Sequence, residues 1–437
     1  MASGSRLTGI ECRVGTTFNV GDARYPDAVE YVPRLVDAEI ERLLGAFPAV
    51  VVVGPRACGK TTTAARRAAS VMRLDQPATA ASVRADPDEA LRSRAEPALL
   101  DEWQDVAEVL GAVKRAVDAD PHPGRFVLTG SVTAHLDAVS WPGTGRLVRL
   151  PMRTMTQREL AGRVEDRPSL REVLTGQVAP NERVDLGGYV DRALAGGFPQ
   201  AVVLEDARDR RTWLDSYVEE LVTRDVARLG SVRDAGRLRR YLQAWALNSA
   251  GIVDDATIWM AAGIDRRTHL AYEQLLADTF VVDVVASWST NRLKRVVMTP
   301  KRYIADSGLM AAAARIGRGD VLGDATLLGR VIDTFVHHQI AGHLATDPDR
   351  PSIHHVRTAG GRQEVDLLLE MDGGRVLAVE VKAGSAPTRT DARHLFWLRD
   401  ELGASFVAGA VLHTGPEIFR FDESVAAIPI SSLWATG

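Results

Sequence analysis

A glycine-rich stretch of eight residues, Gly54–Thr61, carries the residue types that bind nucleotide phosphates. Gly54 and Gly59 allow the backbone to curl so that several N–H groups point at phosphate oxygens. Lys60 can reach the β- and γ-phosphates of a nucleotide, and the Thr61 hydroxyl can hold Mg²⁺. The predicted nucleotide-binding residues are Gly54, Pro55, Arg56, Ala57, Cys58, Gly59, Lys60, Thr61 and Thr62.

The segments on either side of this stretch have the order that a phosphate site requires. The apolar run Ala49–Val53 is typical of a buried strand in a parallel sheet, and Thr62–Val71 has helix-favouring residues without proline. A helix that starts within the loop adds the positive end of its dipole. Strand, loop and helix in this order favour a phosphate site over a chance match in a glycine-rich loop.

Two acids, Asp101 and Glu102, follow the short apolar run Ala98–Leu100. In a P-loop ATPase a strand of this kind lies beside the phosphate loop. We expect Asp101 to hold Mg²⁺, through water, and Glu102 to polarise the attacking water as general base. The alternative is a strand that merely ends in solvated acids. If Glu102 is not the base, Asp105 is the next candidate.

Polar residues at the ends of two further strands are candidate sensors of the γ-phosphate. The strand Arg125–Ser131 ends in the hydroxyl residues Thr129 and Ser131, which a turn would explain nearly as well. The strand Gly145–Leu150 carries Arg146, which we expect to reach the nucleotide, although a single arginine beside a strand is more often at the surface.

These motifs resemble, in order, those of an AAA-like ATPase family of bacteria and archaea whose members carry a C-terminal domain of undefined function. The resemblance extends from about Leu35 to the C-terminus. It implies that ATP and Mg²⁺ bind, and that the first domain contains an ASCE-type parallel sheet. The stretches that carry it are GPRACGKTT, LLDEWQD, FVLTGS, GRLVRLPMRTMTQREL, GGFPQAV, WLDSYVEELVTRDV, TPKRYIADSGL, EVDLLLE and AVEVK.

Two neighbouring strands near the C-terminus place three charged side chains on one face. In the strand Val376–Ala383, Glu380 and Lys382 share a face because side chains alternate. A three-residue turn after the strand Gln363–Leu369 would put Asp366 opposite Glu380.

An aspartate followed by Glu-x-Lys on the next strand is the layout of restriction-endonuclease-like metal sites. There, carboxylates hold a divalent metal and the lysine orients the nucleophilic water. Such folds add an acid from the first helix, and Asp333 stands in that place. This predicts a second divalent metal at a nuclease-like site of Asp333, Asp366, Glu380 and Lys382. The alternatives are a surface ion pair between Glu380 and Lys382, and a fold that only binds.

A winged helix-turn-helix is predicted in the middle of the chain, and the family resemblance supports it. Two short helices, Asp255–Ala262 and Asp265–Ala277, are followed by strands at Phe280–Val285 and Val296–Met298. A packing module beside the ATPase core is the equal alternative to DNA binding. The residues that would meet DNA are Arg266, Arg267, His269 and Tyr272 in the major groove and Lys294 and Arg295 at phosphates.

The expected fold class is α/β and multi-domain. It combines a P-loop parallel sheet, a helical and winged-helix middle, and a C-terminal restriction-endonuclease-like α/β domain. The predicted parts are a weakly ordered extension (1–31), the ATPase domain (32–160), a helical region (161–247), the winged helix (248–310) and the nuclease-like domain (311–437).

Composition narrows the class of function. The 437 residues have a net charge of −4, so any nucleic-acid binding must be local. Two cysteines and the lack of a long apolar run predict a cytoplasmic protein without a membrane partner. We expect an ATP hydrolase coupled to nucleic-acid binding or processing. The alternatives are a nucleotide-dependent switch on a protein partner with an inert C-terminal domain, and an ATP-stabilised assembly scaffold; the sequence does not give the oligomeric state.

Overall fold

A computed structural model describes residues 31–131, 145–165, 167–225, 234–289 and 298–436. The chain divides into two units, Met1–Val32 and Pro33–Gly437, and every described helix and strand lies in the second. Among the described helices, none is long and apolar enough to cross a membrane.

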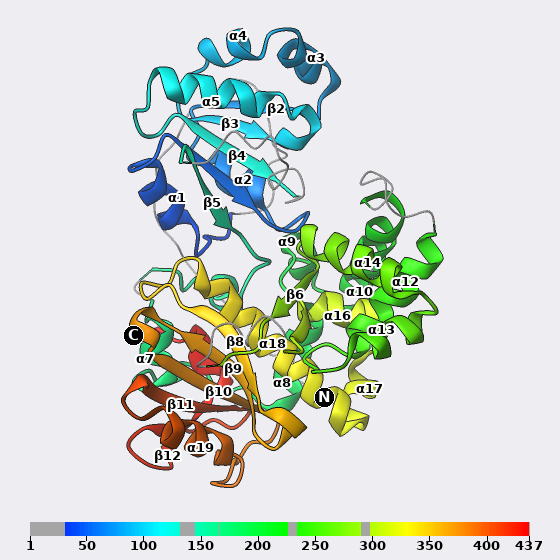
Figure 1. Cartoon of the computed structure of the whole chain (residues 1–437), viewed down its shortest axis with the longest axis vertical. Coiled ribbons are helices and arrows are strands. Elements are labelled where there is room, and N and C mark those ends of the chain that lie inside the picture. Colours follow the sequence, from blue (N-terminus) through cyan, green and yellow to red (C-terminus); the bar gives the residue numbers. More distant parts are fainter. Residues whose placement is uncertain (1–30, 132–144, 166, 226–233, 290–297, 437) are drawn as a thin grey trace, which may run out of the picture. The chain divides into compact units, whose positions relative to one another are not determined.

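The phosphate-loop motif belongs to a five-stranded parallel sheet (Figure 1). The strand order is β2-β3-β4-β1-β5, so β4 lies between β1 and β3, in agreement with the expected ASCE-type sheet. Because parallel strands end at one edge, the residues after β1, β3 and β4 come together there. The strands are β1 (Ala49–Val53), β2 (Ser70–Arg73), β3 (Ala98–Asp101), β4 (Phe126–Gly130) and β5 (Leu147–Pro151).

Both faces of this sheet are buried, which explains its continuous apolar strands. Val51 and Val53 pack in one apolar cluster and Val50 and Val52 in another, because alternate side chains point to opposite faces. The buried parallel strand predicted at Ala49–Val53 is therefore confirmed. The first cluster includes α3 (Pro77–Ala85), α4 (Pro87–Arg92), the 3-10 helix η1 (Trp103–Val106) and α5 (Val109–Ala119), and the second includes α1 (Asp37–Leu44) and α2 (Lys60–Ala65).

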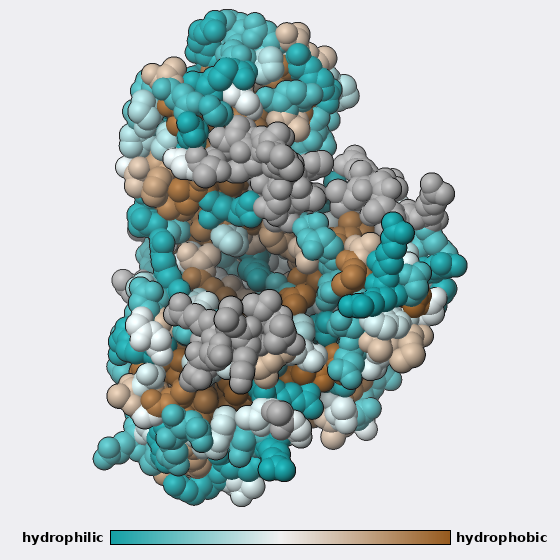
Figure 2. Space-filling model, in the orientation of Figure 1, coloured by the Kyte–Doolittle hydropathy of each residue, from teal (hydrophilic) through white to brown (hydrophobic). Residues whose placement is uncertain are grey.

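The outer surface of this part is polar. In Figure 2 the region over α3, α4 and α5 is largely hydrophilic. Arg84, Glu89 and Arg92, on α3 and α4, are exposed there. The apolar residues of these helices, including Val83 and Leu91, are buried against the sheet.

Helix α2 is shorter than the sequence predicts. It ends at Ala65 instead of continuing to Val71. The reason is that the chain already joins the sheet at Ala69 and Ser70, whose N–H groups donate to the carbonyl of Pro97 at 2.8 and 3.4 Å.

The region predicted to be helical, 161–247, is helical in its described residues. A short helix, α6 (Gln157–Leu160), leads into it from β5. The described elements of region 161–247 are α7 (Leu170–Leu174), α8 (Leu186–Ala195), α9 (Pro199–Val202), α10 (Ala207–Glu220), the π-helical turn η2 (Leu221–Asp225) and α12 (Ala235–Leu247).

The two helices predicted for the winged helix are present as α13 (Asp255–Ala262) and α14 (Arg266–Asp278). The first predicted strand is present as β6 (Val282–Val285), which pairs with β7 (Lys301–Ile304), with Val282 opposite Ile304. The second predicted strand, 296–298, lies mostly outside the described residues, so its pairing stays a prediction. Strand β7 was not predicted from the sequence, because it begins with two basic residues. Both are buried, with Lys301 1% and Arg302 2% exposed.

The C-terminal part contains a six-stranded mixed sheet in the order β12-β13-β11-β10-β9-β8. Strands β9 and β10 are antiparallel and pair as far as Leu367 opposite Val379; beyond this pair, the Val381 N–H donates to Asp366 Oδ2 at 2.9 Å. This agrees with the predicted hairpin. The elements are α16 (Ser307–Ala314), α17 (Arg318–Gly323), α18 (Ala325–Leu344), β8 (Ser352–Arg357), β9 (Glu364–Glu370), β10 (Val376–Lys382), α19 (Arg393–Leu402), β11 (Phe406–His413), β12 (Phe419–Arg420) and β13 (Val425–Pro429).

One apolar cluster joins the middle of the chain to the C-terminal sheet. It extends from Leu170 to Ala435 and includes residues of α8, α12, α16, α18 and the sheet. The domain boundaries at 160, 247 and 310 stay predictions.

Candidate nucleotide site

The two glycines of the phosphate loop are required for different reasons. A Cβ at Gly54 would lie 2.0 Å from the carbonyl oxygen of Met152, which follows β5. The loop therefore passes too close to this backbone for residue 54 to carry a side chain. Gly59 has φ +98° and precedes α2 in the left-handed region, which glycine adopts without strain.

The ammonium group of Lys60 lies against the loop itself. Its Nζ donates to the carbonyl oxygens of Gly54 at 3.0 Å and Pro55 at 2.8 Å, and the residue is 5% exposed. The positive charge is therefore held within the curled loop, where a nucleotide phosphate would approach.

The carboxylate of Asp101 brings together two hydroxyl groups from other elements. Thr61 Oγ1 of α2 donates to Asp101 Oδ1 at 2.7 Å, and Thr129 Oγ1 of β4 donates to the same atom at 2.5 Å. Asp101 is buried. Hydroxyl and carboxylate oxygens are the ligands that Mg²⁺ prefers, so these residues fit the predicted metal site.

Glu102 lies next to this cluster in a left-handed conformation with φ 53°. Its Oε2 accepts a hydrogen bond from Gln104 Nε2. Burial raises the pKa of the Glu102 carboxyl, although the charge of Lys60 opposes the rise. A carboxylate of raised pKa is suited to accept a proton from water near neutral pH.

The sensor candidates are placed differently from one another. Thr129 reaches Asp101, and Ser131 is buried with no hydrogen-bond partner for its Oγ among the described residues. Arg146 precedes the start of β5, at the edge of the sheet opposite the phosphate loop, and forms an ion pair with Asp118 of α5. Its role as a sensor stays a prediction.

Comparison with known proteins identifies this region. A family model described as an AAA domain matches residues 46–161. These residues form an AAA-like P-loop ATPase domain. Two further models, each described as a domain of unknown function, match residues 187–320 (DUF8612) and 328–433 (DUF4143).

Similarity to whole proteins extends along most of the chain. Uncharacterized proteins of Mycobacterium bovis and of Mycobacterium tuberculosis are each 26% identical over 405 residues, which is 92% of this chain and 84% of each relative. A solved structure, a Walker-type ATPase of Pyrococcus abyssi, is 13% identical with a TM-score of 0.38 and covers 64% of this chain and 94% of its own.

A helix outside the AAA domain contributes to the site, and sequence reasoning did not assign it a role. Tyr217 of α10 donates through its Oη to the carbonyl of Arg56 at 3.5 Å. Its ring packs 4.6 Å from Phe198 and 5.6 Å from Trp213. The available signal was that these aromatic residues belong to two of the motifs of the family resemblance. A cavity of about 570 Å³ lies here, lined by Arg56, Ala57, Asp75, Glu102, Asp105, Gln200, Trp213, Ser216, Tyr217, Glu220 and Leu221.

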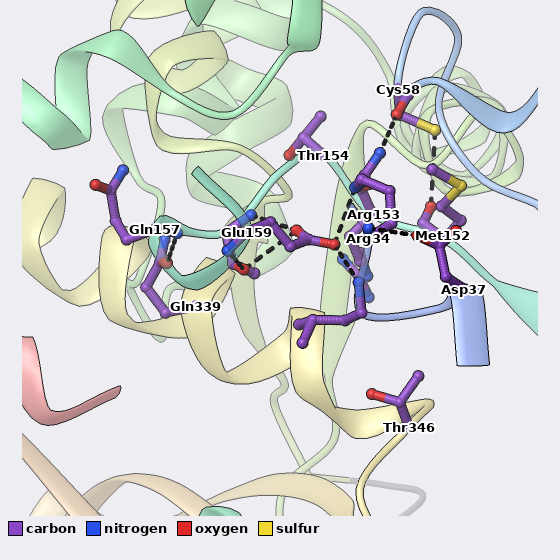
Figure 3. A network of polar contacts seen from close by, with 12 residues as sticks. Arg34, Asp37, Cys58, Met152, Arg153, Thr154, Gln157, Glu159, Gln339 and Thr346 are labelled. Carbon is purple, nitrogen blue, oxygen red and sulfur yellow. Dashed lines mark hydrogen bonds and ion pairs between the residues drawn. The ribbon is translucent and has the colours of Figure 1, made fainter. Parts of the chain in front are cut away.

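Arg34, which precedes α1, contacts the backbone of the phosphate loop (Figure 3). This role was not predicted from the sequence. Arg34 Nη1 donates to the carbonyl of Cys58 at 2.7 Å, its Nε to Glu159 Oε1 at 2.9 Å and its Nη2 to the carbonyl of Arg153 at 2.7 Å. Arg34 and Glu159 are both about 4% exposed. Cys58 is fully buried with its Sγ 3.9 Å from the carbonyl of Met152, so its thiol does not face the nucleotide side.

The candidate nuclease-like residues come together, but around a lysine that sequence reasoning missed. Lys301 Nζ lies 2.6 Å from Asp333 Oδ2 and 2.9 Å from Asp366 Oδ1. Lys382 Nζ lies 2.9 Å from Glu380 Oε2. Among the described residues no group of three His, Cys, Asp or Glu could hold a metal ion. The expected second metal is therefore not supported, because an ammonium group lies between the two aspartates.

The predicted DNA-reading residues are only partly available. His269 and Tyr272 are buried, and Tyr241 Oη lies 2.8 Å from His269 Nδ1, so neither can project into a groove. Arg266 and Arg267 are exposed. The predicted phosphate contacts, Lys294 and Arg295, lie outside the described residues.

Proposed function

We propose that the protein is a Mg²⁺-dependent ATP hydrolase. The observation that carries the proposal is the meeting of Thr61, Asp101 and Thr129 beside Glu102. Lys60 would bind the β- and γ-phosphates, Thr61 and Asp101 would hold Mg²⁺, and Glu102 would take the proton of the attacking water. Bound Mg²⁺ neutralises charge on the transferring phosphoryl group.

We further propose that hydrolysis is coupled to nucleic-acid binding or processing. The exposed pair Arg266 and Arg267 at the start of α14 supports a local contact with phosphates. The competing function is a nucleotide-dependent switch on a protein partner, which is favoured by the contact of α10 with the phosphate loop through Tyr217.

Phosphate release from Mg-ATP by the full chain tests both proposals. The rate is measured alone, and with double-stranded DNA, single-stranded DNA and RNA, with Lys60→Ala as the inactive control. Stimulation that weakens with added salt and in Arg266→Ala/Arg267→Ala supports coupling to nucleic acid. Turnover that nucleic acid leaves unchanged favours the switch, and absence of turnover rejects the hydrolase.

A further inference from the structure

The aspartates Asp333 of α18 and Asp366 of β9 share one buried cation. Lys301 Nζ lies within hydrogen-bond distance of both carboxylates, and 3.4 Å from the backbone carbonyl oxygen of Asp366. Lys301 is 1% exposed. An ammonium group is buried to this degree only when it is paired, so these contacts are what keep it in place.

Every oxygen of the two aspartate carboxylates already accepts a hydrogen bond. Besides Lys301, Tyr303 Oη donates to Asp333 Oδ1 at 3.0 Å, and the Val381 N–H donates to Asp366 Oδ2 at 2.9 Å. A divalent ion here would need these lone pairs and would lie beside a positive charge in a buried site. It could bind only by displacing Lys301, whose ammonium would then be buried without a partner.

The third carboxylate is paired through one of its two oxygens. Glu380 is 3% exposed, its Oε2 accepts from Lys382 at 2.9 Å, and its Oε1 is buried without a hydrogen-bond partner among the described residues. Two lysines thus face three carboxylates. Burial and the neighbouring charge of Asp366 raise the pKa of the Glu380 carboxyl.

The alternation of β7 explains how a lysine reaches this place. Successive side chains of a strand point to opposite faces. Lys301 therefore points to the aspartates of the C-terminal part, while Arg302 points to Asp255 of α13 and Glu273 of α14. The strand thus joins two separate groups of acids.

We infer that the Lys301 ammonium group takes the place between Asp333 and Asp366 that a divalent metal would occupy in a nuclease-like site. The cluster fixes β7 to α18 and β9, binds no divalent metal and supports no cleavage. The C-terminal domain is then a binding or docking module.

Titration of the nucleotide-free full chain with Mn²⁺, followed by electron paramagnetic resonance, tests this. All proteins carry Asp101→Asn, so that the phosphate-loop carboxylate does not contribute. We expect no bound Mn²⁺ with Lys301 present. Lys301→Met keeps most of the side-chain volume and should gain one Mn²⁺ site, with a higher melting temperature in Mn²⁺. Adding Asp366→Asn should remove that gain, and the matched control Lys382→Met should gain nothing.

Two results would overturn the inference. One is Mn²⁺ bound to the protein with Lys301 intact and lost in Asp366→Asn. The other is a folded Lys301→Met variant that binds no Mn²⁺. If Lys301→Met does not fold, the Mn²⁺ titration of the protein with Lys301 intact still decides whether the site binds a metal. Mg²⁺- or Mn²⁺-dependent cleavage of DNA or RNA that disappears in Lys382→Ala would also overturn it, whatever the ATPase measurements show.

Discussion

At the scale of single residues, one carboxylate oxygen organises the candidate site. Asp101 Oδ1 accepts hydrogen bonds from Thr61 and Thr129, which come from different elements of the AAA domain. Lys60 and Glu102 are the chain neighbours of Thr61 and Asp101, and the proposed function gives them separable tasks. Lys60 would bind phosphate, and Glu102 would accept the proton of the attacking water.

Lys60→Ala should weaken ATP affinity by about 100-fold or more, because charge-assisted hydrogen bonds to phosphate are lost. Nucleotide titration by calorimetry measures the change, and circular dichroism should show an intact fold. Lys114→Ala is the matched control, since Lys114 lies on α5 of the same domain and forms an ion pair with the exposed Asp118. ATP affinity that survives in Lys60→Ala would remove the basis of the phosphate-loop assignment.

Glu102→Gln should retain ATP but hydrolyse it about 10²–10⁴-fold more slowly, because the amide cannot accept the proton. The raised pKa of Glu102 adds a pH dependence. The base is the ionised form, so the rate should fall as pH falls through that raised pKa, at a higher pH than for an ordinary glutamate. Asp105→Asn is the comparison. If it slows turnover and Glu102→Gln does not, Asp105 is the base.

Residues with a local sequence signature were predictable, and those defined by distant partners were not. Lys60, Thr61 and Asp101 are specified by short motifs whose spacing fixes their place. No role for Lys301 was predicted from the local sequence, because its two acidic partners are more than 30 residues away. For Arg146, the strand was predictable from the sequence, but the edge of the sheet at which that strand starts was not.

At the scale of elements, the segment before α1 is held to the phosphate loop by a buried ion pair. Arg34 contacts the carbonyl of Cys58 and the side chain of Glu159, and Glu159 also accepts from the N–H groups of Leu35 and Thr156. Three segments distant in sequence therefore share one arginine. Its loss should affect both stability and nucleotide affinity.

Arg34→Met should destabilise the protein by about 3–5 kcal/mol, because Glu159 is left buried without its cation. Arg34→Met/Glu159→Gln should lose less, since no unpaired charge remains. Arg92→Met is the control, because Arg92 and Glu89 form an exposed ion pair of the same kind. Urea unfolding compares the four proteins. Equal losses for the single and double variants would contradict a stabilising role of the pair.

Strands and helices were predicted best where their pattern was apolar. The run of valines in β1 is typical of a buried strand, and the strand was predicted. Strand β7 begins with two basic residues and was not predicted. A strand of this kind is formed by tertiary partners, with Asp333 and Asp366 on one side and Asp255 on the other. Propensity does not include such partners.

At the scale of the whole molecule, several histidines of the middle and C-terminal parts are buried, among them His337, His343 and His355. Burial lowers the pKa of His355 to about 4 and that of His343 well below its usual value. Such groups make the folded state sensitive to acid, because the unfolded chain takes up protons that the folded one cannot.

His337 of α18 allows this effect to be measured at one position. Its ring stacks on Tyr303 at 3.9 Å, with Asp283 3.8 Å from its Nε2. Burial lowers its pKa to about 3, with Asp283 opposing and Arg153 adding to the shift. An unfolded histidine protonates near pH 6.5, so its contribution to stability is present above that pH and is lost as pH falls toward 3.

His337→Phe keeps an aromatic ring on Tyr303 but removes the titration. Between pH 7.5 and 5.5 the stability of the unmodified protein should fall relative to the variant by about 1.4 kcal/mol, as expected for one proton taken up on unfolding. Urea unfolding at the two pH values, followed by tryptophan fluorescence, measures the difference. His343 and His355 titrate in both proteins, so their effects cancel in the comparison. A difference that stays constant with pH would mean that His337 is charged in the folded protein, and that Asp283 outweighs the burial of the ring.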